Sequence, residues 1–281
     1  MSHSDTDQLS NAIGYFGPDT ITWQLYREPV FVFGGVRALL LQVAHPAVAD
    51  GVAHFSSFQS DPFGRGYRTF AAMAMIYFGT RQQAEATAGR LWRIHAAIRG
   101  AYPVSSPENP HLKSEIQYTA NDPGLLLWVL ATLTDTTFRV YEKIPLPGLP
   151  PDWKERFYEE SKTAARLLGI PKEAYPADLQ AFERYMDTML NGELLGSAPA
   201  CRAMAQAIVQ HPRAPKKMAA LFAAGWLPGP LCRRLGIDAG ENPEVRMEKW
   251  LRRIGRCYQW LPGWLRYNPA YHQAQYRLAR V

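Results

Sequence analysis

Residues 61–100, DPFGRGYRTFAAMAMIYFGTRQQAEATAGRLWRIHAAIRG, predict two helices that meet at a tight corner. The first helix has a favourable start, because Asp61 is a good N-cap and Pro62 falls at the first helical position, where a missing N–H costs nothing. Gly79 stands where helices often end on a left-handed residue. We therefore expect the first helix to begin at Pro62 and to end just before Gly79.

The second helix begins immediately after this corner. Thr80 and Gln83 have the spacing of a capping box, in which each side chain satisfies the free backbone N–H of the other residue. Gly100 is placed to end this helix.

The side chains that these helices turn inward are partly polar. Arg65, Arg68 and Thr69 lie at i, i+3 and i+4 on one face of the first helix. The same face continues with two residues that we expect in the core, Ala72 and Ile76. The apolar stripe of the second helix consists of Ala84, Ala88, Leu91, His95 and Ile98. The imidazole of His95 should therefore lie on the buried side, and because cations at a helix N-terminus oppose the macrodipole, we expect an anion beside the two arginines.

This inward cluster has two interpretations. In the first, His95 is a core histidine bonded to a carbonyl, and the arginines are solvated charges at the start of a helix. In the second, the cluster is a haem pocket, in which a neutral imidazole supplies the axial iron ligand while guanidinium and hydroxyl groups bind the propionates or act on the distal side. The residue types by themselves allow both interpretations.

The segment Arg65-Gly66-Tyr67-Arg68-Thr69, followed one helix later by His95, resembles the signature of a known family. That family contains the bacterial rubber oxygenases (latex-clearing proteins) and the fungal mycophenolate-pathway oxygenase. The similarity extends to REPVFVFGGVRALLLQVAHPAVADGV (27–52), to DPGLLLWVLATLTDTTFRVYEK (122–143) and to the Trp/Arg-rich C-terminal part. It covers nearly the whole chain and indicates a short, single-domain bacterial member.

The resemblance implies an all-α fold with a globin-like helical core that binds haem b, and with additional C-terminal helices. It implies that His95 is the proximal ligand of the iron, and that Arg65 and Thr69 bind the cofactor in the haem pocket. The rubber oxygenases have a lysine at the position of Arg68, and that lysine can cap the iron. Because a guanidinium stays protonated and is a poor iron ligand, we expect Arg68 to serve as a cofactor-binding and catalytic group without forming the capped state.

His45 precedes a proline, which disfavours helical geometry at His45 and often marks a corner between helices. Its structural interpretation is therefore a residue that caps a corner. Because it lies in the segment that leads to Arg65, His45 is also a candidate catalytic residue on the distal side of the haem. There it would act as a second iron ligand or as a hydrogen-bond donor to bound oxygen.

The composition describes an ordinary globular protein. The chain has 281 residues, of which 47% are hydrophobic and 20% charged, and we expect a polar segment at 1–20 followed by one all-α domain at 21–281. Residues 1–10, MSHSDTDQLS, lack the basic and apolar regions of a secretion signal, which predicts a cytoplasmic protein. The three cysteines show no C-x-x-C spacing, so we expect buried thiols and neither a disulfide, a zinc site nor covalent haem attachment.

The rest of the pattern is also helical. No run alternates convincingly between polar and apolar residues as a strand would. Residues 101–122 are rich in Pro, Ser and Asn and predict a long loop, either a lid or a flexible excursion. Asp122 and Pro123 open a strongly apolar helix that should end near Lys143. The apolar run at 30–52 is interrupted by Gly34-Gly35 and by charged residues, which favours buried helices over a membrane span.

The C-terminal part is basic and aromatic. Residues 246–281 contain eight Lys or Arg and one Glu, interleaved with Trp and Tyr. This composition suits peripheral contact with a membrane, where arginines meet anionic headgroups and indoles lie at the acyl boundary. The alternative is that the aromatic side chains pack on the core while the arginines stay in water. No nucleic-acid motif is present, so we expect no nucleic-acid partner.

The leading hypothesis is a haem b-dependent oxygenase whose partners are O2 and an apolar small molecule, and by the resemblance the substrate is an alkene or isoprenoid that is cleaved or oxidised. The protein would fix the iron, set the polarity around it and shield a dry channel. Two alternatives remain open: a non-catalytic haem protein that senses or carries oxygen, and a helical scaffold without cofactor. The oligomeric state is not encoded in any motif.

Overall fold

The structure is a computed structural model that describes residues 9–55, 62–101, 117–144, 148–210, 216–238 and 240–280. Its elements, after helical residues 9–13, are α2 (Ile21–Tyr26), η1 (Pro29–Gly34), α3 (Gly35–Ala44), α4 (Pro46–Phe55), α5 (Pro62–Phe78), α6 (Arg81–Ala96), β1 (Arg99–Ala101), β2 (Gln117–Thr119), α7 (Pro123–Lys143), α8 (Trp153–Leu167), α9 (Leu179–Asn191), α10 (Pro199–Val209), α11 (Lys216–Trp226), α12 (Gly229–Leu235), α13 (Pro243–Gln259), α14 (Gly263–Arg266) and α15 (Pro269–Leu278). The all-α prediction is therefore confirmed, apart from one short pair of strands.

The α5–α6 corner follows the prediction, with two corrections. The capping box is present, since the Gln83 N–H donates to Thr80 Oγ1 (3.1 Å) and the Thr80 N–H donates to Gln83 Oε1 (2.9 Å). Gly79 is not left-handed; it is required because a Cβ there would lie 2.3 Å from the Met75 carbonyl oxygen. Asp61, the expected N-cap, lies outside the described residues. Ala72 and Ile76 are buried as predicted.

Gly100 does not end α6, which stops at Ala96. Instead it lies in β1, where Gly100 pairs with Tyr118 of the antiparallel strand β2. A Cβ on Gly100 would lie 2.7 Å from the Tyr118 hydroxyl, so glycine lets that ring pack directly on the backbone. The expected loop at 101–122 thus has a strand at each end, and residues 102–116 lie outside the described part of the chain.

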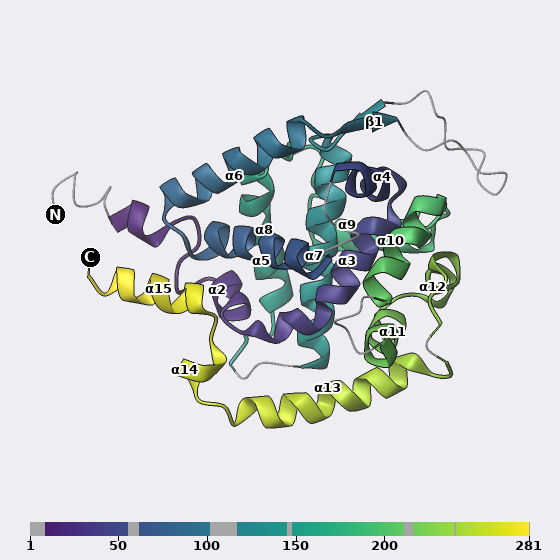
Figure 1. The fold of residues 1–281 in the computed structure, drawn as a ribbon. Helices are drawn as coiled ribbons and strands as arrows, with labels where there is room; N and C mark the ends of the chain where they lie inside the picture. The colour runs from purple at the N-terminus through teal and green to yellow at the C-terminus, as the bar shows by residue number, and fades with distance from the viewer. Residues whose placement is uncertain are drawn as a thin grey trace.

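α7 lies at the centre of the fold and has the predicted bounds, Pro123–Lys143. In Figure 1 it passes between the α5–α6 pair and the group formed by α3, α4 and α10. The Trp128 side chain is fully buried and donates from Nε1 to the Leu41 carbonyl of α3 (3.0 Å). Asp122 does not cap α7 with its side chain, because Oδ2 instead accepts from the Thr119 N–H (2.9 Å) of β2. A close approach of η1 to α7 requires Gly34, where a Cβ would lie 2.4 Å from Thr136 Cγ2.

A buried ion pair joins α3 to α7. The Arg37 guanidinium donates to the Asp135 carboxylate, to Thr136 Oγ1 (2.7 Å) and to the Trp226 carbonyl of α11 (3.3 Å). Burial lowers the pKa of Arg37, and the negative charge of Asp135 opposes that shift. A single side chain therefore ties three helices together.

The apolar run at 30–52 forms η1, α3 and most of α4, packed within the protein. Of the described helices, none alone has the length and hydrophobicity needed to cross a bilayer; one pair, residues 32–44 with 46–55, meets those criteria together but is bent by 99°. Cys201 and Cys232 are buried as expected, but Cys257 is exposed, because it lies on the outer side of α13.

Candidate functional site

The first cavity lies between α4, α5, α6 and α7 and has a volume of about 180 Å³. Its described lining is almost entirely aliphatic and aromatic, and it contains no carboxylate, cysteine, lysine or arginine. The lining residues are Gln42, Ala47, Val48, Gly51, Val52, Thr69, Ala72, Met73, Ala88, Leu91, Trp92, His95, Ile98, Tyr118, Ala120, Leu125, Leu126, Val129, Leu130, Leu133 and Leu168. The apolar stripe predicted for the second helix supplies much of this wall.

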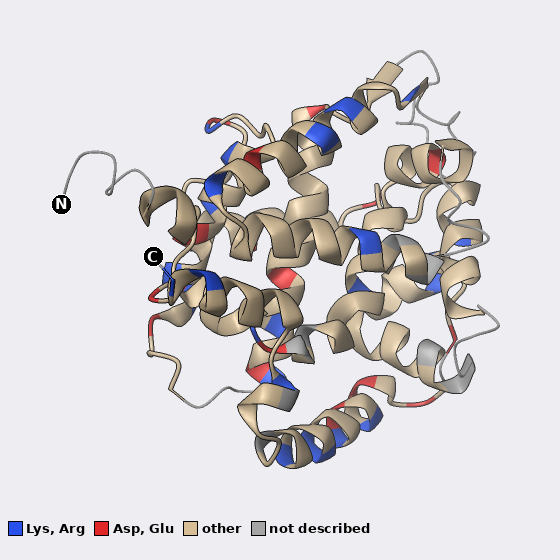
Figure 2. Ribbon diagram, turned by 60° about the vertical axis from the view of Figure 1, so that its left-hand side comes forward, with Lys and Arg blue, Asp and Glu red and all other residues tan. Residues whose placement is uncertain are grey.

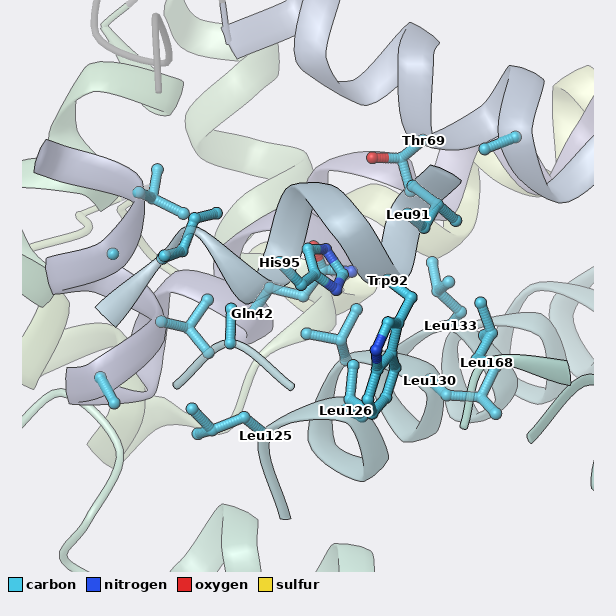
Figure 3. A pocket seen from close by; sticks show the side chains of 18 of the residues that line it. Gln42, Thr69, Leu91, Trp92, His95, Leu125, Leu126, Leu130, Leu133 and Leu168 are labelled. Atoms are coloured by element: carbon cyan, nitrogen blue, oxygen red, sulfur yellow. The ribbon is translucent and has the colours of Figure 1, made fainter. Parts of the chain in front are cut away.

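His95 is the one imidazole in the described lining of this cavity. It lies in the last turn of α6 and is half-buried. Figure 3 shows its ring directed toward the middle of the labelled side chains, beside Trp92, with Leu126 and Leu130 of α7 on the far side. The imidazole thus borders an apolar cavity, a position from which a histidine could bind a haem iron.

A second, larger cavity adjoins the first and has a volume of about 400 Å³. It lies between α3, α5 and α7, and its lining is also mainly apolar. The two cavities share a wall made of Gln42, Thr69, Met73 and Leu133. Two exposed residues, Val32 and Tyr67, line the outer part of the second cavity. The fold therefore holds two adjacent apolar chambers, of which the first carries the imidazole.

The structure brings only part of the predicted cluster together. Thr69 lies on the common wall and so reaches the cavity that contains His95. Arg68, its neighbour on α5, is exposed and lines neither cavity, since successive residues of a helix point in directions about 100° apart. Arg65 belongs to the first turn of α5, and its side chain lies outside what the structure describes. The roles predicted for Arg65 and Arg68 stay predictions.

His45 lies at the corner between α3 and α4. This is the position that its place before Pro46 predicted. Its backbone N–H donates to the Gln42 carbonyl (3.3 Å), and its carbonyl accepts from the Ala49 N–H (2.9 Å). The side chain is only 6% exposed and lines neither cavity. Burial lowers the pKa of His45 to about 4, so the imidazole is neutral near pH 7. Its predicted distal role is not tested by this placement.

Two residues of the site were missed in the sequence. Gln42 is a buried amide on the common wall, and its Nε2 donates to Thr132 Oγ1 of α7 (3.3 Å). The sequence could have indicated Gln42, because it is a polar amide within the apolar run ALLLQVA (38–44). Trp92 lies over Gly169, which has φ +83°, and a Cβ there would lie 2.6 Å from the indole ring. In the sequence, Gly169 was the only hint of this contact, and it could not reveal Trp92, which lies 77 positions away.

The donor chemistry fits haem better than a bare metal ion. Among the described residues no group of three or more His, Cys, Asp or Glu side chains could hold a metal ion. Haem iron takes its equatorial nitrogens from the porphyrin and needs only one protein ligand, which a single histidine on an apolar wall provides. The first cavity is smaller than the roughly 300 Å³ at which ligand pockets begin, and the second lies within their range. A bound porphyrin would therefore need the first cavity to widen, for example by movement of the exposed side chain of Trp92 that lines it.

Fold and site together define an all-α protein with an imidazole-bearing apolar cavity beside a second apolar chamber. The chain belongs to the family of the ER-bound oxygenase mpaB/B′ and rubber oxygenase, since the model of that family's catalytic domain matches residues 23–260. The resemblance inferred from residues 65–69 and His95 is thereby confirmed at the level of the family, which is one of oxygenases.

The curated relatives that match the chain carry no assigned activity. An uncharacterized protein of Mycobacterium bovis is 27% identical over 235 residues, which cover 81% of this chain and 84% of that protein. An uncharacterized protein of Mycobacterium tuberculosis matches with the same identity and coverage. No solved structure matches the chain.

Proposed function

We propose that this protein is a haem b-dependent oxygenase that uses O2 to cleave or oxidise an apolar alkene or isoprenoid-type substrate. The observation that carries the proposal is the imidazole of His95 on the wall of an apolar cavity, in a member of an oxygenase family. When bound, haem would supply the activation of O2, which amino-acid side chains do not provide.

The chain's own residues would bind, orient and exclude water. His95 would hold the iron through one ring nitrogen. Thr69 and Gln42 would set the polarity between the two chambers, because they are the polar residues among the described members of the common wall. Arg65 and Arg68, at the start of α5, would bind anionic groups of the cofactor. The leucines of α7 would keep bulk water from the space in front of His95.

The second chamber is the proposed place of the substrate. Its volume of about 400 Å³ suits a small apolar molecule, and it meets the first chamber at a shared wall. An alkene bound there would lie next to the chamber that carries His95, within a mainly apolar lining. A protein that only senses or carries O2 has no need of such a chamber, which favours the oxygenase.

The first test is an absorption spectrum of the purified protein, oxidised and dithionite-reduced, together with a pyridine haemochrome assay. We expect a Soret band typical of haem b, and we expect His95→Ala to lose most of it, because no second imidazole lines the described cavity. His54→Ala is the matched control, since His54 is an exposed histidine on α4 that hydrogen-bonds to the Asp50 carbonyl. It should keep the wild-type spectrum.

A wild-type protein that binds no haem and takes up no added hemin would contradict the oxygenase and leave the cofactor-free scaffold. A haem-loaded protein whose reduced iron stays six-coordinate and rejects O2 would favour the non-catalytic alternative.

Filling the second chamber tests the place of the substrate. Ala74 is buried on α5 and lines this chamber alone, so Ala74→Leu should fill space that the substrate needs while leaving the haem spectrum unchanged. We expect kcat/KM for an apolar alkene to fall by about tenfold or more, the usual cost of crowding a hydrophobic pocket. Ala71→Leu on the same helix lines neither chamber and should keep wild-type kinetics. Equal kinetics for both variants would place the substrate elsewhere.

A further inference from the structure

α13 and the turn that follows it carry exposed basic and aromatic side chains. We define the α13 surface as Lys249, Trp250, Arg253, Arg256, Trp260 and Trp264. Figure 1 shows α13 along one edge of the molecule, and Figure 2 shows Lys and Arg residues repeated along the same helix. This surface plays no part in the two chambers of the site.

One side of α13 is fixed to the protein. Met247 and Leu251 are buried, and α13 packs closely on α11, where a Cβ on Gly225 would lie 2.8 Å from Met247 Cβ. The opposite side of the helix therefore faces outward, and its basic residues lie there. The sequence of this segment allowed two predictions, packing of its aromatic residues on the core or contact with a membrane. In the structure the apolar side of α13 packs on the protein, whereas the indoles of Trp250, Trp260 and Trp264 are exposed.

The acidic residues of α13 do not neutralise this outward side. Glu248 accepts from Lys143 of α7 and lies 3.4 Å from Arg252, and Glu244 lies 3.9 Å from the same lysine. Within the described part of the chain, no carboxylate lies at ion-pair distance from Lys249, Arg253 or Arg256. The outward face is thus a row of cations.

The indoles of the surface are unusually exposed. Trp260 is 88%, Trp264 75% and Trp250 44% accessible to solvent. A large amphipathic ring gains from leaving water, and indoles favour the boundary between headgroups and acyl chains. Trp260 and Trp264 lie at one end of the row of cations, an arrangement that suits insertion into a bilayer better than stacking of successive bases along a nucleic-acid strand.

The turn that carries these two indoles is anchored at both ends. Tyr258 donates its hydroxyl to Glu28 Oε2 (2.6 Å), and Arg266 donates from Nη2 to Glu28 Oε1 (3.0 Å). Glu28 itself is buried beside η1. One carboxylate thus holds both sides of residues 260–264, so the indoles are presented from a fixed support, and little conformational entropy is lost when they bind.

We propose that the α13 surface binds the surface of an anionic lipid bilayer. Lys249, Arg253 and Arg256 meet the negative headgroups, while Trp260 and Trp264 enter the boundary of the acyl region. The same C-terminal segment continues to Asn268, which lines the second chamber, so a docked protein would hold that chamber close to the source of an apolar ligand. The docking surface itself does not depend on haem or on catalysis.

The test is flotation of the full-length protein with vesicles of phosphatidylcholine, with and without about one third phosphatidylserine. We expect binding to the anionic vesicles that weakens with added salt. Lys249→Gln/Arg253→Gln/Arg256→Gln should lower the partition coefficient about a hundredfold, from the contribution of each basic residue near a charged membrane. Trp260→Ala/Trp264→Ala should weaken binding and remove the quenching of tryptophan fluorescence by brominated lipids.

Arg90→Gln/Lys172→Gln/Arg184→Gln is the matched control, because it removes the same charge from exposed residues outside the α13 surface. It should bind vesicles as the wild type does. Equal losses in both triple variants would overturn the proposal, and so would equal binding to neutral and anionic vesicles. It would also be overturned if the wild type ignored vesicles but bound single-stranded nucleic acid, or formed a dimer that the tryptophan variant abolished. Spectra of these variants report on haem separately.

Discussion

Replacing Arg37 by methionine should lower the free energy of unfolding by about 3–5 kcal/mol, the usual cost of removing one partner of a buried ion pair. Arg37 is only 2% exposed, and methionine keeps its apolar length but not its charge. In the described part of the chain, the variant would leave the buried Asp135 carboxylate with the half-exposed Arg139, 3.6 Å away, as its ion-pair partner. The Trp226 carbonyl would lose a donor as well. Denaturant unfolding followed by circular dichroism measures the loss.

Two further variants separate this effect from a general loss of arginine. Arg37→Met/Asp135→Leu removes both charges and should recover much of the stability, because a well-packed apolar pair often matches a buried ion pair. Arg252→Met removes an exposed arginine that lies 3.4 Å from Glu248 and should cost no more than about 1 kcal/mol. A double variant no more stable than Arg37→Met would contradict the role assigned to the unpaired carboxylate.

Acidification should destabilise the protein through His45. The folded imidazole has a pKa of about 4 because it is buried, whereas the unfolded one titrates near 6.5, so only the unfolded state takes up the proton between these values. Stability is therefore fully present above about pH 6.5 and is lost as the pH falls toward 4. From pH 7 to pH 5 the loss should be about 2 kcal/mol.

His45→Gln should remove this part of the pH dependence, whatever its effect on stability at pH 7. The measurement is the free energy of unfolding at several values between pH 7 and pH 5, a window in which ordinary carboxylates stay ionised. His272→Gln, at an exposed position of α15, controls for the loss of an imidazole and should keep the wild-type slope. If the wild type and His45→Gln lose stability in parallel, the buried imidazole is not the cause.

Local interactions explain why much of the fold was predictable. The capping box of Thr80 and Gln83 and the bounds of α7 depend on residues three or four positions apart, so the sequence contains both partners. The same holds for the inward stripe of α6 that ends near His95. Gly79 follows α5 as predicted, although it is not left-handed. The prediction for Gly100 was wrong, because Gly100 does not end α6 but lies in β1, where it lets the Tyr118 ring, remote in sequence, pack on the backbone.

Positions in the candidate site were predictable only where they depend on the pattern within a single helix. That His95 faces inward follows from the helical period of α6. The helical period of α5 predicted both Arg68 and Thr69 on the inward side. Only Thr69 reaches the cavity, because the rotation of α5 about its axis, relative to α3 and α7, decides which of the two side chains points inward. The family signature identified the segment but could not give that rotation.

By itself, the sequence of this protein determined an all-α chain, the bounds of its central helices, the inward position of His95 and the family to which it belongs. Only the tertiary structure decided which remote residues meet: Arg37 with Asp135, 98 positions apart, and Gln42, Thr69 and Leu133 on one wall between two chambers. It also decided which aromatic residues of the C-terminal part are exposed. The reason is physical, since helix period and capping act over a few residues, whereas ion pairs and cavity walls arise from the packing of helices whose contacts no local pattern encodes.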